Sequence, residues 1–347
     1  MELPTRCAYP TMGGRSTYTV LGFTGYLVAS ILGAVLASLW GLDLVARLIT
    51  FFAPPLAFLA VVYSAKRFVG YERIVFYQTS IAGVVVTAIA AAIAGEPVAR
   101  CVDIATVGIG TFLVFGRIGC FSVACCHGKL GPFGVRYGQA HVKIGFWKRW
   151  AGRTLWPVQL AESFASLALV VLGLVIGWDE PGTPALIYIA SYSVIRFLLE
   201  LLRGDSARPH RWGLSEAQVT APLTAIACVI WRPSILTGLP AALLVGLAIA
   251  LVVRRTAREL WMPAHLHAID KCCTTLLRDP SARVETPLGL AVSQHQLPDG
   301  RRDWVMSSTH PHWSPVVARK VAASLFTQSE VVEGRLAGVI HVITREG

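Results

Sequence analysis

Four polar side chains recur at one-turn spacing in an apolar segment, and their types suit the binding of an anion. The four are Tyr192, Arg196, Glu200 and Arg203, with spacings of four, four and three residues. On a helix this spacing places them on one face. An arginine near the middle of a bilayer costs roughly 2.5–3.5 kcal/mol on the scale from insertion experiments, and Glu200 one turn from Arg196 lowers that cost. A structural ion pair between helices is the alternative, but it leaves Tyr192 and Arg203 on the same face unexplained.

A second arginine stands in the segment Gly116–Gly128, which reads GRIGCFSVACCHG. Apolar residues enclose Arg117, and Gly119 beside it permits close approach of the backbone to a ligand or a neighbouring helix. Two arginines inside a membrane can hold a phosphate by bidentate contacts. We therefore expect Arg117 and Arg196 to meet around one anionic headgroup.

The same segment carries Cys120, Cys125, Cys126 and His127, all of which are types that bind metal ions. Their spacing lacks the paired C-x-x-C arrangement of zinc sites, and no second half is evident. We interpret them as small polarisable residues that pack near a turn, and we predict no metal and no cofactor.

These residues need elements that place them within a bilayer. Of 347 residues, 54% are apolar and 15% are charged, whereas soluble domains average about a quarter charged. The apolar residues come in blocks of about twenty, the length of a membrane-crossing helix. The blocks are 18–39, 44–64, 74–95, 102–123, 157–177, 183–202, 214–231 and 235–253. Arg232 and Pro233 separate the last two, so we expect eight spans, or seven with a surface segment.

The composition changes after Arg254 and Arg255, and residues 265–347 hold six of the nine histidines. Alternation of polar and apolar residues predicts two strands within 288–309, joined by a turn at Pro298-Asp299-Gly300. A helix at 315–327 and a strand at 339–344 follow. The predicted fold class is an all-α polytopic membrane protein with a small C-terminal soluble α+β domain. We predict two domains in the chain, a transmembrane domain at 1–255 and a soluble domain of unknown role at 256–347.

Other features narrow the possible functions. The formal charge of +11 is spread over loops, which favours contact with anionic lipid over nucleic acid. The sequence contains no G-x-S-x-G elbow, P-loop or H-E-x-x-H. Asp103 opens a predicted span, and we expect it to be the N-cap of that helix rather than a catalytic acid. Residues 1–15 do not resemble a signal peptide, so the first span is expected to remain in the mature protein.

Five segments in the same order resemble the prolipoprotein diacylglyceryl transferase family over roughly residues 17–232. They are Gly116–Gly128, Phe133-Gly134-Val135, Pro157–Glu162, Tyr192-x3-Arg196-Phe197-x2-Glu200-x2-Arg203, and Gly213-Leu214-Ser215-x2-Gln218. The sequence departs from the family where Tyr77 stands in place of a histidine followed by two glycines. It departs again at Trp156, where the family has a histidine.

The resemblance implies transfer of the diacylglyceryl group of phosphatidylglycerol to the lipobox cysteine of a prolipoprotein signal peptide, with a thioether as product. The implied setting is the inner membrane of a bacterium. Arg117 and Arg196 would stabilise the leaving phosphate, Glu200 would orient Arg196, and Tyr77 would accept the thiol proton. Residues expected to bind substrate are Tyr18, Gly119, Gly128, Gln159, Glu162, Tyr192 and Arg203.

Two other classes of function fit part of the pattern. A transporter or flippase for an anionic lipid would also need arginines within the membrane, but no inverted repeat is visible. A paralogue that keeps the fold and has lost catalysis would account for the missing histidine and glycines.

Overall fold

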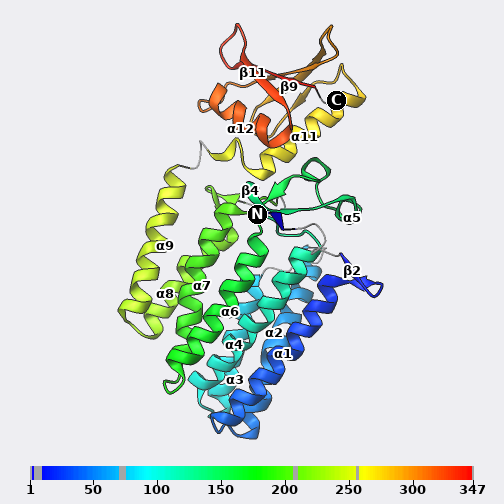
Figure 1. Cartoon of the computed structure of the whole chain (residues 1–347). Coiled ribbons are helices and arrows are strands. Elements are labelled where there is room, and N and C mark those ends of the chain that lie inside the picture. Colours follow the sequence, from blue (N-terminus) through cyan, green and yellow to red (C-terminus); the bar gives the residue numbers. More distant parts are fainter. Residues whose placement is uncertain (1, 4–9, 70–75, 206–209, 255–257, 346–347) are drawn as a thin grey trace.

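The computed structural model describes residues 2–3, 10–69, 76–205, 210–254 and 258–345. A bundle of long helices forms one end of the molecule, and a smaller region of strands and helices lies on the other (Figure 1). The bundle comprises α1 (Thr17–Leu39), α2 (Leu44–Val69), α3 (Phe76–Ala94), α4 (Val98–Ser122), α6 (Val158–Gly177), α7 (Thr183–Leu202), α8 (Glu216–Trp231) and α9 (Ile235–Val253). The prediction of a polytopic helical membrane protein is confirmed.

Seven of the described helices are long and apolar enough to cross a membrane, and α8 is a shorter apolar helix of 16 residues. At 1.5 Å per residue α8 spans about 24 Å. It runs between α7 and α9, and α9 returns the chain to the end that carries strand β2 (Thr11–Met12) (Figure 1). Helix α8 is therefore the segment on which the choice between seven and eight predicted spans depends.

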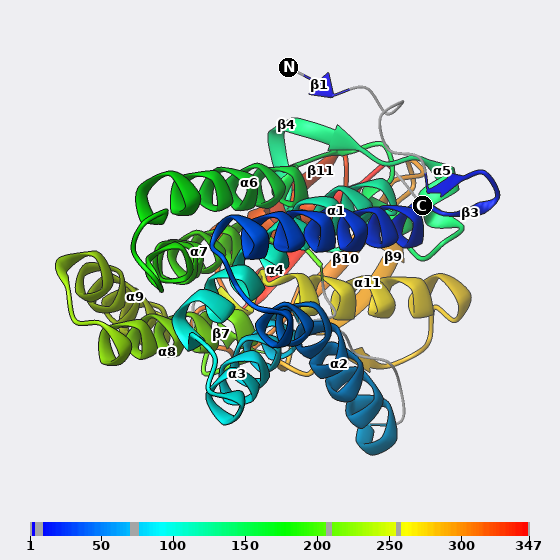
Figure 2. The same cartoon turned by 90° about the horizontal axis from the view of Figure 1, so that it is seen from below.

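Helix α4 is the centre of the bundle, where it packs against α1, α3, α6 and α7 (Figure 2). It is the most buried of the candidate spans and α7 is the next, whereas α1, α2 and α9 turn most of their surface outward. The outer helices expose leucine, isoleucine and phenylalanine side chains, as a lipid environment permits. Polar groups on α4 and α7 are therefore held away from lipid.

Asp103 does not have the role that its place in the sequence predicted. Helix α4 begins at Val98, so Asp103 lies within the helix and is fully buried. Its carboxylate accepts hydrogen bonds from the backbone N–H groups of Gly182 (2.8 Å) and Ala185 (3.0 Å). It thus caps α7 rather than its own helix and satisfies donors that a helix start leaves unpaired. The prediction of an N-cap for its own span is wrong.

The segment after α4 folds into short elements that close one end of the bundle. They are β4 (Leu130–Arg136), α5 (Gln139–Val142), a 3₁₀ turn (Lys148–Trp150) and β5 (Thr154–Leu155). Strand β4 pairs in parallel with β1 (Glu2–Leu3) and antiparallel with β5. We call residues 124–156 the cap loop. The Ser215–Gln218 motif likewise has a structural basis, because the two residues form a reciprocal capping box at the start of α8.

The C-terminal region contains an antiparallel sheet with strand order β11-β12-β10-β9-β8. Its elements are α11 (Pro263–Arg278), β8 (Val284–Glu285), β9 (Ala291–Gln296), β10 (Arg302–Ser307), α12 (Pro315–Leu325), β11 (Ser329–Glu333) and β12 (Val339–Thr344). The predicted strand pair, helix and last strand are present. The sequence reasoning missed α11, β8 and β11. Buried side chains of the sheet, such as Trp304 and Val342, join one hydrophobic cluster with Ile269 of α11 and Val321 of α12.

The C-terminal region packs on the cap loop through specific polar contacts. Trp147 stacks on His267 with ring centroids 3.7 Å apart and donates a 2.8 Å hydrogen bond to Asp270. Arg149 forms a 2.5 Å ion pair with the other oxygen of Asp270. Trp150 donates to the backbone carbonyl of Ser324 at 3.0 Å. The same hydrophobic cluster includes residues of both parts, so the division into two domains at residue 255 stays a prediction.

Substitution of Asp270 tests this contact. In Asp270→Ala the donors of Trp147 and Arg149 lose their acceptor, and we expect the C-terminal region to lose about 1–3 kcal/mol of stability. Protease cleavage near Arg254 in detergent, followed together with thermal unfolding, measures the effect. Glu330→Ala is the control, because Glu330 is exposed and its pair with Arg301 is worth little. Equal cleavage of Asp270→Ala and wild type would contradict the contact.

Candidate functional site

The carboxylate of Glu162 on α6 joins two arginines from different spans. Its Oε1 atom lies 2.9 Å from Nη2 of Arg117 on α4 and 3.6 Å from Nε of Arg196 on α7. The hydroxyl of Tyr192 donates to the same oxygen at 2.6 Å. Glu200 holds Arg196 from the other side, with 2.7 Å between Oε2 and Nη2. The structure thus brings Arg117 and Arg196 to one place, as the sequence led us to expect.

Burial of these ionised side chains carries a cost in hydration free energy. Arg117 is 5% exposed, Arg196 is 2% exposed and Glu162 is 1% exposed. Ions of this kind lose several kcal/mol of hydration each, which only close pairing offsets. Two guanidinium groups and two carboxylates, those of Glu162 and Glu200, balance in charge. The group of four can therefore exist inside the bundle without a bound ligand.

The pairing leaves spare donors. Within the described part of the chain, Nε of Arg117 and Nη1 of Arg196 have no hydrogen-bond partner although both atoms are buried. Buried donors without partners are rare in proteins and call for a physical explanation. Guanidinium groups suit phosphate because their fork of N–H donors matches two oxygens at once. The two free donors therefore have the chemistry of an anion site that is partly filled by Glu162.

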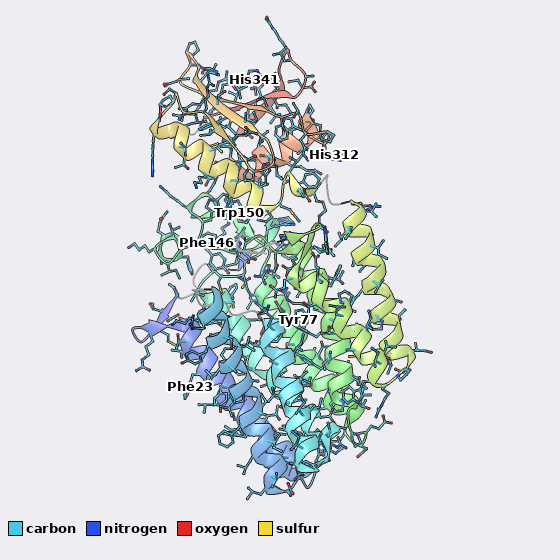
Figure 3. The ribbon with its side chains drawn as sticks, turned by 180° about the vertical axis from the view of Figure 1, so that it is seen from behind. Phe23, Tyr77, Phe146, Trp150, His312 and His341 are labelled. Atoms are coloured by element: carbon cyan, nitrogen blue, oxygen red, sulfur yellow. The ribbon has the colours of Figure 1, made fainter. Side chains whose placement is uncertain are left out.

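Tyr77, predicted to accept the thiol proton, lies inside the bundle on α3 (Figure 3). Its ring is 6.1 Å from that of Tyr192. Among the described residues its buried hydroxyl has no hydrogen-bond partner. A free phenol has a pKa of about 10, so an isolated tyrosine is a poor proton acceptor near neutral pH.

Tyr18 on α1 is 38% exposed. It borders a hollow of about 410 Å³ lined by Pro10, Thr11, Ser16, Tyr18, Val123, Cys125 and Ile144. Gly119 lets α1 approach α4 closely, since a Cβ at Gly119 would lie 3.2 Å from Cα of Tyr18. Gly119 therefore has a packing role in the structure.

The remaining predicted binding residues hold the cap loop in place. Gln159 donates to the carbonyl of Cys125 at 2.8 Å. Arg203 binds both carboxylate oxygens of Asp205, at 2.8 and 3.0 Å. Gly128 pairs with Arg203 as an isolated bridge, and a Cβ there would collide with the carbonyl of Trp156. These three residues do not contact the carboxylate of Glu162.

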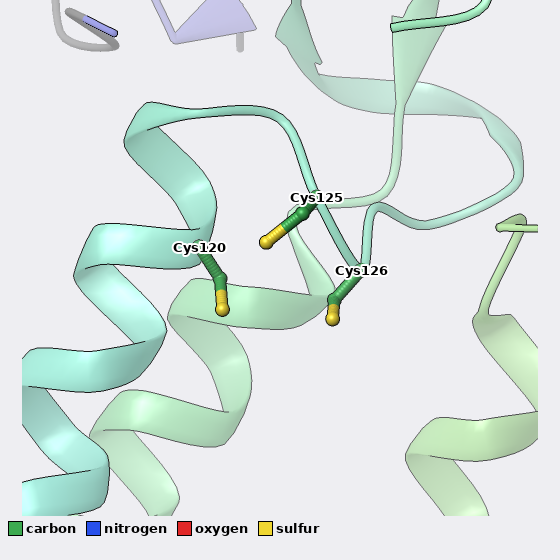
Figure 4. A group of neighbouring side chains, drawn as sticks. All are labelled: Cys120, Cys125 and Cys126. Atoms are coloured by element: carbon green, nitrogen blue, oxygen red, sulfur yellow. The ribbon is translucent and has the colours of Figure 1, made fainter. Parts of the chain in front are cut away.

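The cysteines after Arg117 come together more closely than the sequence interpretation assumed. The sulfur atoms of Cys120, Cys125 and Cys126 all lie within 4.8 Å of one another, and the three side chains converge in Figure 4. Hydrogen bonds from the other two thiols, and then the charges of Arg203 and Arg117, hold the pKa of Cys126 well below its usual range. His127 does not join them, because its ring packs on Phe146 and Trp150.

Sequence reasoning missed two functional features of this site. It assigned Glu162 to substrate, whereas the structure makes it the shared partner of both arginines. The signal for this was a carboxylate inside an apolar span, because such a group needs a cation. The sequence reasoning also judged the cysteines by their spacing alone. It missed their cluster because the turn that brings them together does not require a C-x-x-C pattern.

Comparisons with known proteins identify the family of the chain. The family model described as prolipoprotein diacylglyceryl transferase matches residues 23–232, which is more than half of the 347 residues. Phosphatidylglycerol–prolipoprotein diacylglyceryl transferase 2 of Clostridium perfringens is 31% identical over 110 residues, which cover 30% of this chain and 40% of that protein. The matched part therefore spans less than half of that relative. Because the family model covers the helices that carry Arg117, Glu162 and Arg196, the chain belongs to the prolipoprotein diacylglyceryl transferase family.

Proposed function

We propose that the protein transfers the diacylglyceryl group of phosphatidylglycerol to the lipobox cysteine thiol of prolipoproteins. The observation that carries the proposal is the meeting of Arg117 and Arg196 on one buried carboxylate, with a free donor on each arginine. The name of the matched relative supports this choice of donor and acceptor. The protein would act in the inner membrane of a bacterium, where both substrates are held in the same bilayer.

The reaction needs fixed positive charge at one place. The acceptor sulfur forms a bond to the glyceryl carbon while the bond from that carbon to the phosphate oxygen breaks. The phosphate diester, with one negative charge, leaves as glycerol phosphate with a second charge developing on the departing oxygen. Donors that already point at this oxygen in a water-poor site stabilise the transition state more than they stabilise the substrate. Arg117 and Arg196 would supply those donors.

Glu162 would set the affinity for phosphate by competition. In the ligand-free arrangement its Oε1 atom accepts from Arg117 and from the hydroxyl of Tyr192. A phosphate oxygen that enters would share or take over these donors. Arg196 would keep its orientation because its bond to Glu200 does not involve Glu162. The acceptor thiol must also lose its proton, since the thiolate is the nucleophile.

Removal of either arginine is expected to abolish most of the activity. In Arg117→Ala and Arg196→Ala we expect the rate of lipid attachment to fall about 100- to 1000-fold, as for the loss of one donor in other preorganised sites. The measurement is the mass shift of a lipobox peptide in membranes from cells depleted of their own transferase. Lys143→Ala is the control, because Lys143 is an exposed cation on the cap loop.

The outcomes of this assay separate the competing functions. Activity that survives both substitutions would contradict the proposed role of the arginines. A wild-type protein that attaches no lipid would favour an anionic-lipid transporter or an inactive lipid-binding paralogue. Movement of a fluorescent phosphatidylglycerol between leaflets of proteoliposomes distinguishes those two.

Substitution of Glu162 tests the competition directly. Glu162→Gln keeps the shape of the side chain but leaves two buried guanidinium groups short of an anion, so we expect a loss of about 3–5 kcal/mol of stability. Anionic phosphatidylglycerol should raise the melting temperature of the variant in detergent more than that of wild type. Phosphatidylcholine is the control lipid, since its headgroup carries no net charge. Equal shifts in variant and wild type would show that Glu162 and the lipid phosphate do not share the arginines.

A further inference from the structure

The three cysteines of Figure 4 are held together by the backbone around them. Cys120 is in the last turn of α4, and Cys125 and Cys126 lie in the turn that follows. Ala124 (φ 58°) and Cys126 (φ 54°) both adopt the left-handed conformation that residues other than glycine seldom use. The N–H of Cys125 donates to the carbonyl of Cys120 at 3.1 Å. Strained backbone of this kind clusters at functional sites.

Two arginines stand near the three thiols. Arg117 precedes Cys120 by three residues on α4, so both side chains lie on one helical face. Arg203 approaches from the end of α7, and the charges of both arginines act on Cys126. Each arginine also has a carboxylate partner, Glu162 or Asp205. Because carboxylates offset the charges of both arginines, the three thiols do not face an uncompensated positive charge that would exclude a bound cation.

We propose that Cys120, Cys125 and Cys126 bind one zinc ion and leave its fourth position open for the thiol of the acceptor peptide. The identity of that fourth ligand rests on the proposed function, whereas the metal site does not. Zinc–sulfur bonds of about 2.3 Å place tetrahedral sulfurs about 3.8 Å apart. The sulfur atoms, which lie within 4.8 Å of one another, need to move together by no more than about 1 Å.

The open position has an approach from outside. Cys125 lines the hollow of about 410 Å³ that Tyr18 borders, and its side chain is exposed. Zinc sites that have three protein ligands and one free position are typical of catalysis, while structural sites are closed by four. A peptide thiol that enters the hollow would thus reach the metal next to the helix that carries Arg117.

This site would provide another way to remove the proton of the acceptor thiol. A thiol that coordinates a metal ion is deprotonated outright, and its proton passes to water. The acceptor sulfur then bonds to the glyceryl carbon, and the departing glycerol phosphate takes the electron pair of the broken carbon–oxygen bond. No electrons are exchanged with the zinc ion. Three thiolates and Zn²⁺ together carry one negative charge.

Metal binding is tested without reference to activity. The purified full chain in detergent, reduced and stripped with a chelator, is titrated with Cd²⁺ and with Zn²⁺. We expect one ion per chain and a sulfur-to-cadmium charge-transfer band. In Cys120→Ala/Cys125→Ala/Cys126→Ala the affinity should fall by more than about 100-fold, since loss of a partner outside the ligand shell can already cost that much. The matched control is Cys101→Ala/Cys228→Ala, which removes two buried thiols of the spans.

Wild-type protein that binds no zinc, or binds it as weakly as the triple variant, overturns the metal site. Folding of the variants is checked by circular dichroism and gel filtration. Should the triple variant fail to fold, X-ray absorption of the zinc-loaded wild type decides, because it must show three sulfur ligands. Fewer than three sulfurs overturns the proposal.

The fourth ligand is tested with a lipobox peptide and its cysteine-to-serine counterpart on cadmium-loaded protein. Addition of the cysteine peptide should increase the charge-transfer band by about a third, as three thiolate ligands become four, and the serine peptide should not. If cadmium is bound but the cysteine peptide leaves the charge-transfer band unchanged, the peptide thiol is not the fourth ligand. That result overturns activation of the thiol by the metal and does not affect the proposed transfer reaction. If the band increases but the zinc-loaded enzyme attaches no lipid to the peptide, the proposed transfer reaction is wrong and the proposed metal site is retained. Full transfer activity in stripped enzyme overturns the role of the metal in catalysis.

Discussion

The carboxylate of Glu162 joins two buried guanidinium groups from different helices, and Glu200 supplies the second negative charge that balances them. Removal of one partner from a buried pair leaves an uncompensated charge, which costs far more than the pair itself contributes. This requirement ties α4, α6 and α7 together at one depth. It also explains why these helices form the protected interior while α1, α2 and α9 face outward. The same ion pairs therefore fix the geometry of the site and hold the three helices together.

The same helix brings together the two parts of the reaction chemistry. Arg117 and Cys120 are one turn apart on α4, so the arginine that we propose to stabilise the leaving phosphate stands beside a cluster of thiols. The cap loop completes this arrangement, because Gln159 fixes the carbonyl of Cys125 and Arg203 meets the backbone of Gly128. Substitutions in the cap loop would therefore act on the nucleophile side of the site, and substitutions at Glu162 or Glu200 on the phosphate side.

The sequence predicts well what depends on local periodicity. Apolar blocks located the spans, and the one-turn spacing on α7 placed Arg196 and Glu200 on one face. The sequence predicts poorly those features that depend on contacts between distant segments. Asp103 caps a helix that starts eighty residues later, and no local pattern reveals that. The meeting of Arg117, Glu162 and Arg196 was expected only in part, because spacing fixes a face of a helix and not its neighbour. The cysteine cluster required a left-handed turn at Ala124 and Cys126, where glycine would have been the recognisable signal.

The C-terminal region packs on the cap loop, next to the turn that carries the thiols. Trp150 of the cap loop packs on His127, which follows Cys126, and also donates to the carbonyl of Ser324 at the end of α12. One hydrophobic cluster continues from the cap loop into the sheet. Contacts that restrain Trp150 therefore restrain the turn that holds the thiols. A cap loop without this support would keep its covalent connection to α4 but lose the packing that fixes its shape. The C-terminal region thus stabilises the mouth of the site from outside the bundle.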